Sequence, residues 1–162
     1  RSVGGVASSA NGLMSQMEPI EVHEHPLPGR VKGRGVLIGR FGRGDEGLLV
    51  AVAHLSLGAQ SRLTQLSFIA EILSDAPNAV LMGDFNCLAR EPEMEVLYRH
   101  TRLQPQDHDV CTFPAWNPQR AIDHVLTTDS ILSTMRAAVP AAASDHLALS
   151  VELDVPGIAL RR

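Results

Sequence analysis

The feature that most constrains the fold is the apolar run LLVAVAHLSL at residues 48–57. Side chains alternate between the two faces of a β-strand, so a run that is apolar at successive positions buries both faces. The sheet that contains this strand must therefore be covered on both sides. Over residues 61–74 the apolar spacing changes to a helical period, which predicts a helix directly after the strand. Its apolar stripe comprises Leu63, Leu66, Ile69, Ala70 and Leu73.

Further strands and a second helix are predicted along the rest of the chain. The sequence GRGDEG at 42–47 is typical of a hairpin turn. Residues 101–120 are polar and rich in proline, which predicts a long loop of the kind that is usually functional or disordered. Strand patterns occur at 35–41, 79–83, 121–128 and 146–154, and a shorter helix at 92–100. Helices placed between strands predict an α/β (α+β) layered fold, in a single domain covering residues 1–162.

The composition is that of an ordinary globular chain without a strong charge. The 162 residues are 44% hydrophobic and 20% charged, and the net charge of −4 does not favour long duplex nucleic acid. The two cysteines, Cys87 and Cys111, have no zinc-type spacing and cannot form a disulfide framework. No apolar run reaches the roughly 18 residues of a membrane span. The first residues do not resemble a signal peptide, and we expect a cytoplasmic protein without a transmembrane segment.

Two polar residues, Asp84 and Asn86, follow the strand at 79–83 in the stretch LMGDFNCLAR. Residues two apart on an extended chain point the same way, so both side chains are expected together at the carboxyl end of the strand. Ligands gather at that end in open α/β folds, and a carboxylate beside an amide suits a hard cation with its water. The alternative is an Asx-type cap of the next turn, which is the more frequent role of an isolated D-x-N.

Three other predicted strand ends carry Asp or His. His54 lies on the face of the valines in its strand, where a lone histidine is more often a core residue than a catalyst. Asp123 faces the core side while His124 points the other way, and a buried carboxylate needs a partner because burying it alone is costly. Asp145 and His146 lie where a loop enters the last strand.

These residues together carry a family resemblance. In order, VAVAHLSLG, RLTQL, AVLMGDFN, TFPAWNPQRAIDHVL and ASDHLALSVEL resemble the motifs of the endonuclease/exonuclease/phosphatase superfamily. That superfamily includes pancreatic-type deoxyribonucleases, apurinic endonucleases, sphingomyelinases and inositol phosphatases. The TFPxWxPQRxIDH form is similar to its small bacterial branch of metal-dependent hydrolases. Order and spacing match from about Asn11 to Asp154, and GDFN followed by SDH is far more specific than either motif alone.

The resemblance implies a deoxyribonuclease I-like layered sandwich, in which two packed, mainly antiparallel β-sheets are flanked by helices. It also implies a Mg²⁺ or Mn²⁺ site at one end, with Asp84 and Asp145 in the metal region. A phosphodiester is an anion that resists hydroxide, so catalysis must neutralise charge and position water, and a divalent ion does both without a covalent nucleophile. Cys87, beside these residues, is interpreted as a packing residue and not a nucleophile.

The same resemblance implies a role for each catalytic candidate. Asp84 would orient or deprotonate the attacking water, and Asn86 would hold that water or a phosphate oxygen. His54 would donate a hydrogen bond to the phosphate and stabilise the charge that develops in the transition state. His146 would act at the phosphate, oriented by Asp123, because a carboxylate fixes the tautomer of an imidazole and raises its pKa.

Other residues have two interpretations each. Arg62 and Gln65 match an R-x-x-Q motif of the family, in which Arg62 either binds substrate or, with Gln65, ties the helix to the core. Trp116 is the other candidate substrate contact, by stacking on a base or touching a lipid headgroup, although aromatic residues more often pack a loop down. His23 and His25 have a spacing that could chelate a metal, but two imidazoles without partners are usually surface residues.

The sequence departs from the family pattern at its start. The family's first strand and helix, and a strand whose glutamate binds the metal, have no counterpart; residues 11–29 already resemble a later segment of the form GNALLSRxPI. Glu18, Glu21 and Glu24 lie too far along to replace that glutamate. We therefore expect a domain without its N-terminal third, weak metal binding and exposed sheet edges. The chain is a truncated form, receives these elements from another chain, or rearranges or self-associates through the open edge.

Two functions are compatible with these residues. The carboxylate and histidine set favours a divalent-metal-dependent phosphoester (phosphodiester) hydrolase that uses an activated water. The missing glutamate favours a catalytically dead family member that serves as a binding or structural module. The substrate is a small phosphodiester, a phospholipid headgroup or a nucleic acid, and the net negative charge favours the first two over long duplex nucleic acid. We predict little or no hydrolase activity for this chain alone, and robust Mg²⁺-dependent cleavage of a generic phosphodiester would contradict it.

Overall fold

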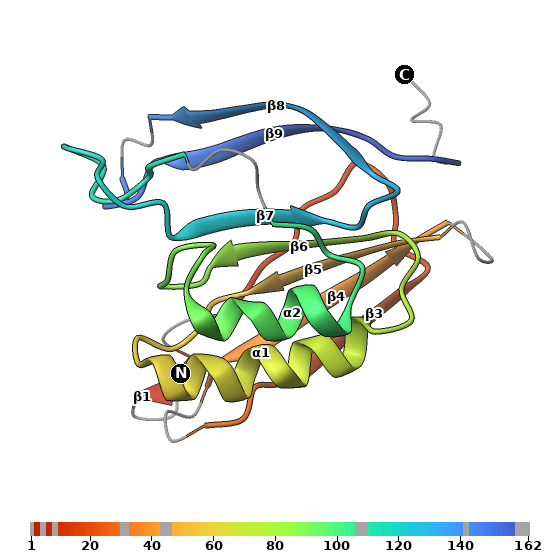
Figure 1. The fold of residues 1–162 in the computed structure, drawn as a ribbon, viewed down its shortest axis with the longest axis horizontal. Helices are drawn as coiled ribbons and strands as arrows, with labels where there is room; N and C mark the ends of the chain where they lie inside the picture. The colour runs from red at the N-terminus through yellow and green to blue at the C-terminus, as the bar shows by residue number, and fades with distance from the viewer. Residues whose placement is uncertain are drawn as a thin grey trace.

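The main element of the computed structural model is a five-stranded sheet in the order β3-β4-β5-β6-β7 (Figure 1). Neighbouring strands are antiparallel except β5 and β6, which are parallel. The structure describes residues 2–3, 6–7, 10–29, 33–42, 47–105, 110–140 and 143–157. The strands are β3 (Glu21–Pro26), β4 (Gly35–Phe41), β5 (Leu48–Ala53), β6 (Ala79–Asp84) and β7 (Asp123–Thr127).

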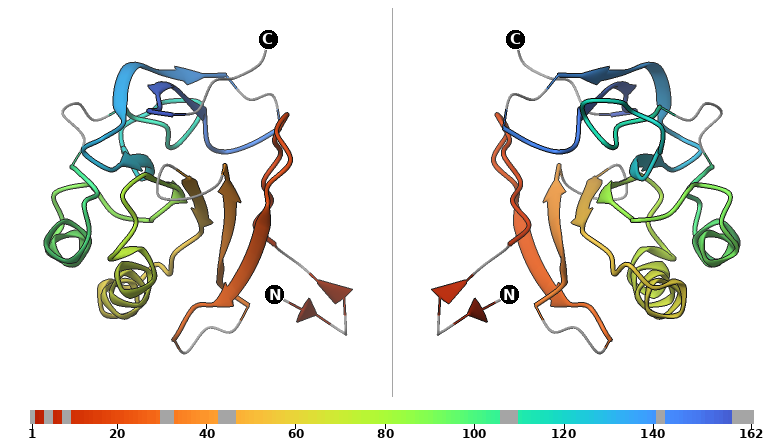
Figure 2. Two further views of the ribbon diagram at one scale, coloured as in Figure 1. Left: turned by 90° about the vertical axis from the view of Figure 1, so that its right-hand side faces the viewer. Right: turned by 90° about the vertical axis from the view of Figure 1, so that its left-hand side faces the viewer.

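Helices cover one face of this sheet (Figures 1 and 2). They are α1 (Ala59–Leu73), the short 3-10 helix η2 (Pro92–Met94) and α2 (Glu95–His100). The predicted stripe of α1 is buried from Leu66 onwards, whereas Leu63 is 37% exposed and lies outside the core. Among the described residues, no helix has the length and apolar character that crossing a membrane requires.

A second, two-stranded sheet covers part of the opposite face (Figure 2). It consists of β8 (Leu132–Val139) and β9 (Ala148–Asp154), which are antiparallel, while β1 (Ser2–Val3) and β2 (Val6–Ala7) form a separate small ladder. The core on this side contains Phe41, Leu48, Val80, Val125 and Ile131. Both faces of β5 are therefore covered, as its apolar sequence predicts, and the layered sandwich with helices at its side is confirmed.

Most predicted elements are confirmed, and the differences have physical causes. The strand predicted at 48–57 ends at Ala53, where the chain turns towards α1. β8 was not predicted, because several of its positions are polar or small and exposed and give no alternation signal. Most of the predicted hairpin turn, residues 43–46, lies outside the described residues, although β4 and β5 are paired antiparallel as that turn requires.

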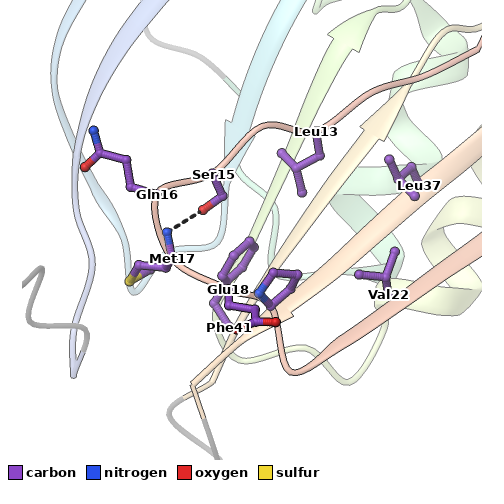
Figure 3. Close-up of a pocket in the computed structure, with 9 residues that line it drawn as sticks. Leu13, Ser15, Gln16, Met17, Glu18, Val22, Leu37 and Phe41 are labelled. Atoms are coloured by element: carbon purple, nitrogen blue, oxygen red, sulfur yellow. Dashed lines mark hydrogen bonds between the residues drawn. The ribbon is translucent and has the colours of Figure 1, made fainter.

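An apolar pocket of about 400 Å³ lies between residues 13–19 and strands β3 and β4 (Figure 3). Its apolar lining includes Leu13, Met17, Leu37 and Phe41. Nearby, Met14 is 98% exposed, and Ile20 and Val22 are also exposed. This agrees with the expectation of exposed apolar surface, while self-association through an open edge stays a prediction.

The backbones of β5 and β6 approach each other closely at Gly83. A Cβ atom built on Gly83 would lie 1.9 Å from the carbonyl oxygen of Ala53, and the φ of Gly83 is +137°. We expect Gly83→Ala to lower the free energy of unfolding by about 3 kcal/mol or more, because the backbones must separate and an L-residue is strained at this φ. Unfolding in denaturant measures this loss of free energy. Gly12→Ala, where nothing lies within 4 Å of the new Cβ, should change stability by no more than about 0.5 kcal/mol. Equal losses in both variants would contradict this role of Gly83.

Candidate active site

The candidate site lies where β5 and β6 end and β7 begins. Asp84 is the last residue of β6 and is paired in register with Asp123, the first residue of β7. His146 comes from the segment that leads into β9. The donor atoms of these three side chains lie within 4.8 Å of one another, and in the described part of the chain no other group of His, Cys, Asp or Glu meets this criterion. Parallel and antiparallel neighbours thus gather ionisable groups from distant sequence positions at one end of the sheet.

The two carboxylate oxygens of Asp84 have different partners. Oδ1 accepts a hydrogen bond from the backbone N–H of Asn86 at 2.9 Å, and Oδ2 lies 3.3 Å from Nε2 of His54. Asn86 has a φ of +55°, so the chain is no longer extended there, and its side-chain Nδ2 donates to the Leu55 carbonyl at 3.0 Å. The extended chain on which the prediction of a shared direction rests therefore does not continue to Asn86. Asp84 both caps the turn and reaches the site.

These contacts favour the ionised form of Asp84. Burial acts to raise the pKa of Asp84, but the hydrogen bonds from His54 and from the Asn86 amide oppose it. The positive charges of His54 and His146 act in the same direction, and the pKa of Asp84 is lowered from its ordinary value of 3.8. Asp84 is therefore a carboxylate at neutral pH, which is the form that binds a cation or accepts a proton from water.

Asp123 holds the ring of His146. Oδ2 of Asp123 accepts a hydrogen bond from the hydroxyl of Thr112 at 2.5 Å and lies 2.7 Å from Nδ1 of His146. Because an ionised carboxylate only accepts, Nδ1 of His146 carries the donated proton. The ring of Phe113 lies against the imidazole, with 4.8 Å between ring centroids. The imidazole is thereby oriented, as the family resemblance implies.

The charge environment of His146 favours its protonated form. Burial acts to lower the pKa of His146, but the hydrogen bond to Asp123 and the negative charges of Asp123, Asp84 and Asp145 act to raise it. The result is a pKa of His146 above its ordinary value of 6.5.

His54 and Asp145 lie at the periphery of the group. The side chain of His54 is 48% exposed, and its carbonyl accepts a hydrogen bond from Arg34 at 3.1 Å. Asp145 is exposed, its carbonyl accepts the Ala115 N–H at 2.7 Å, and it is not a member of the three-residue group. Its assignment to the metal region stays a prediction.

Thr112 is the residue of this site that sequence reasoning missed. It is fully buried, and its carbonyl also accepts the N–H of Leu147, the residue after His146. It is the first residue of the TFPAW motif, which lies in the predicted loop at 101–120. The resemblance of this motif to the family is the one sequence signal that could have identified Thr112. A hydroxyl residue in a loop belongs to no periodic pattern.

The structure places Arg62 and Gln65 in helix-to-core contacts. The guanidinium of Arg62 is buried, donates from Nε to Glu93 at 2.8 Å and also donates to the Leu57 carbonyl. Gln65 is fully buried, accepts the Ser56 N–H at 2.9 Å and donates to the Ser56 hydroxyl at 3.1 Å. The assignment of Arg62 as a substrate contact is therefore corrected, because its guanidinium is buried and already paired with Glu93.

Trp116 does not pack as expected, whereas Cys87 does. Trp116 is 77% exposed, so the expectation that it packs the loop down is wrong. Phe113 makes that contact instead, against His146.

Cys87 is buried, and burial raises the pKa of its thiol to about 12. A thiol with this pKa is protonated at neutral pH, which agrees with packing and not with a nucleophile.

Comparisons with known proteins give one family and one fold. The sequence model of the Endonuclease/Exonuclease/phosphatase family matches residues 3–146. A functionally unknown conserved protein from Enterococcus faecalis is similar in structure, with a TM-score of 0.70 at 21% identity, covering 85% of this chain and 67% of that one. A mannosyl-6-phosphatase from Bacteroides thetaiotaomicron gives a TM-score of 0.69 at 18% identity, with 85% and 67% covered.

A third solved structure with a similar fold contains DNA. D. rerio TDP2, solved with a single-strand DNA product, gives a TM-score of 0.67 at 16% identity, covering 85% of this chain and 68% of that one. At these identities the likeness concerns the fold. The chain spans about two thirds of the length of these three structures. A comparison with curated proteins finds no match to the sequence.

The contact between Asp123 and His146 makes a pH-dependent prediction. NMR titration of the metal-free chain should give His146 a pKa above 6.5, and Asp123→Asn should lower it. A histidine whose pKa is higher in the folded than in the unfolded chain stabilises the fold below pH 6.5, and this contribution is lost as the pH rises through the folded pKa. Asp129→Asn, which changes an exposed carboxylate paired with Arg102, is the control. An unchanged His146 pKa in Asp123→Asn would contradict the assignment.

The buried pair of Arg62 and Glu93 makes a prediction about stability. We expect Arg62→Ala to lower the free energy of unfolding by about 3–5 kcal/mol, because it leaves the Glu93 carboxylate buried without its partner. Arg62→Met combined with Glu93→Leu should recover most of the loss, since no charge remains buried. Arg99→Ala, in an exposed pair with Glu95, should cost about 0.5 kcal/mol or less. A loss for Arg62→Ala as small as this control would show that the buried pair is unimportant.

Proposed function

The chain belongs to the Endonuclease/Exonuclease/phosphatase family, and on that premise we propose that it is a divalent-metal-dependent phosphoester hydrolase that uses an activated water. The observation that carries the proposal is the convergence of Asp84, Asp123 and His146 at the end of the sheet. Carboxylates with water are ligands that fit Mg²⁺ or Mn²⁺, and an imidazole is a hydrogen-bond donor for a phosphate. In this proposal Mg²⁺ or Mn²⁺ is the cofactor.

The donor set fits a divalent ion in charge as well as in type. Asp84 and Asp123 are register partners on adjacent strands, so their carboxylates repel each other unless cations neutralise them. Asp84, with Asp145 as the second carboxylate that the family resemblance implies, would hold the ion. When bound, the metal ion supplies neutralisation of the phosphate charge and a water of lowered pKa.

The histidines act on the phosphate in this proposal. Since Nδ1 of His146 is taken by Asp123, Nε2 is the nitrogen left to donate to a phosphate oxygen. His54 lies 3.3 Å from Asp84 and its side chain is half exposed, so we assign it a second hydrogen bond to the phosphate. Both donations stabilise the charge that develops on the phosphate oxygens in the transition state.

Asp84 and Asn86 have separate tasks. Asp84 orients the attacking water and accepts its proton, since its lowered pKa keeps it ionised. Asn86 donates its amide hydrogen to the Leu55 carbonyl, so we assign it to positioning. By holding Leu55, it fixes the chain that follows His54.

The alternative is a catalytically dead member that acts as a binding or structural module. Its support is that, in the described part of the chain, only three possible ligand side chains converge at the site. Three protein donors hold Mg²⁺ weakly, because this ion needs six ligands in octahedral geometry.

Calorimetric titration with Mn²⁺, combined with a rate assay, separates the two functions. The hydrolase proposal predicts a heat of binding that Asp84→Asn removes, and a slow Mn²⁺-dependent release of p-nitrophenol from bis-p-nitrophenyl phosphate. His146→Gln should lower this rate by about 100-fold, as expected for loss of a charge-stabilising donor. The exposed His100→Gln is the matched control. Absence of both heat and turnover would favour the binding module.

The substrate proposal rests on Trp116. A 77% exposed tryptophan in the loop that precedes β7 is available to contact the organic group of a phosphodiester by stacking. We expect Trp116→Ala to raise KM with little change in kcat, because a contact of this type stabilises ground state and transition state alike. A fall in kcat at constant KM would place Trp116 in a different role.

A further inference from the structure

A second cluster of possible metal ligands lies on β3, the strand at the edge of the five-stranded sheet opposite β7 (Figure 1). Glu21, His23 and His25 occupy alternate positions of this strand, so their side chains share one face. That face is the one covered by helices, because the register partners of His23 and His25 on β4 are the buried Ile38 and Val36.

The three residues lie at the border of the helical layer. Together with Ile38, Leu49 and Ile72 they line a depression of about 220 Å³, and the ring of His25 lies 6.3 Å from that of Phe68 on α1. Glu21 and His23 are more than half exposed, whereas His25 is half-buried against α1. A ligand can therefore enter from solvent while one wall of the site is fixed by the helix.

One pair of donor atoms is already close to the separation that a metal ion imposes. Nε2 of His23 lies 3.6 Å from Oε2 of Glu21, and the ring centroids of His23 and His25 lie 6.2 Å apart. Around a tetrahedral zinc ion with bond lengths of about 2.0–2.1 Å, ligand atoms are about 3.3 Å apart and imidazole centroids about 5 Å apart. Among the described residues these three donors do not lie within 4.8 Å of one another, so binding requires the side chains of His23 and His25 to rotate.

We propose that Glu21, His23 and His25 form a second metal site, which takes a transition-metal ion such as Zn²⁺ or Ni²⁺ and leaves a remaining position to water. Imidazole suits zinc, nickel and copper, whereas carboxylate and water suit magnesium and manganese. This site therefore differs in selectivity from the group of Asp84, Asp123 and His146. The exposed Arg40, whose Nε lies 3.9 Å from Glu21, forms only a weak competing pair.

The site is tested by NMR with paramagnetic Ni²⁺ added to the metal-free chain. We expect amide signals of β3, and of Ile38 and Ile72 beside it, to broaden at substoichiometric Ni²⁺. The titration is repeated with Asp84→Asn, which removes a ligand of the other group, and the broadening around β3 should persist. This keeps the result independent of whether the hydrolase proposal holds.

Calorimetry with Zn²⁺ supplies the matched variants. His23→Gln combined with His25→Gln should weaken Zn²⁺ binding at this site by at least about tenfold. Glu24→Gln, on the opposite face of the same strand, and His100→Gln, an exposed histidine on α2, should leave the affinity unchanged. The proposal is overturned if Ni²⁺ leaves the β3 signals of the unmodified chain sharp. It is also overturned if the double variant binds Zn²⁺ as tightly and in the same ratio as the two controls.

Discussion

The site depends on the close parallel pairing of β5 and β6. Gly83 permits the approach, because the Ala53 carbonyl occupies the position where a Cβ would stand. The pairing continues past the strands, since the N–H of Leu55 donates to the Asp84 carbonyl at 2.9 Å. His54 and Asp84 are therefore held side by side as the two strands end. The antiparallel β7 then brings Asp123 opposite Asp84.

This arrangement places an imidazole beside each of two neighbouring carboxylates. Without the imidazoles, β6 and β7 would bring two negative charges together. Asp84 and Asp123 face each other, and each has a histidine: His54 at 3.3 Å and His146 at 2.7 Å. The same attraction lowers the pKa of Asp84 and raises that of His146. The carboxylates of this group can bind a divalent cation, and its imidazoles can donate hydrogen bonds to an anionic phosphate.

The sequence predicts the strands of the sheet and the residues of the site better than it predicts the contacts between those residues. Alternation placed Asp123 on the face opposite His124, and His124 is buried on the helix side with its ring 5.0 Å from Phe85. The apolar strand patterns are clear around Asp84 and His54, so the sequence predicts that both residues lie at strand ends. In contrast, the left-handed backbone of Asn86, the bond from Thr112 to Asp123 and the pairing of Arg62 with Glu93 are set by segments distant in sequence. No local pattern encodes them.

The central claim is that a divalent cation binds beside the group of Asp84, Asp123 and His146, with Asp84 as one of its ligands. Its most direct test is the NMR titration of His146 in the absence and presence of saturating Mg²⁺. A bound cation disfavours protonation of a neighbouring imidazole, so the account predicts that Mg²⁺ lowers the pKa of His146 and that Asp84→Asn removes this effect. A His146 pKa that Mg²⁺ leaves unchanged would contradict the account.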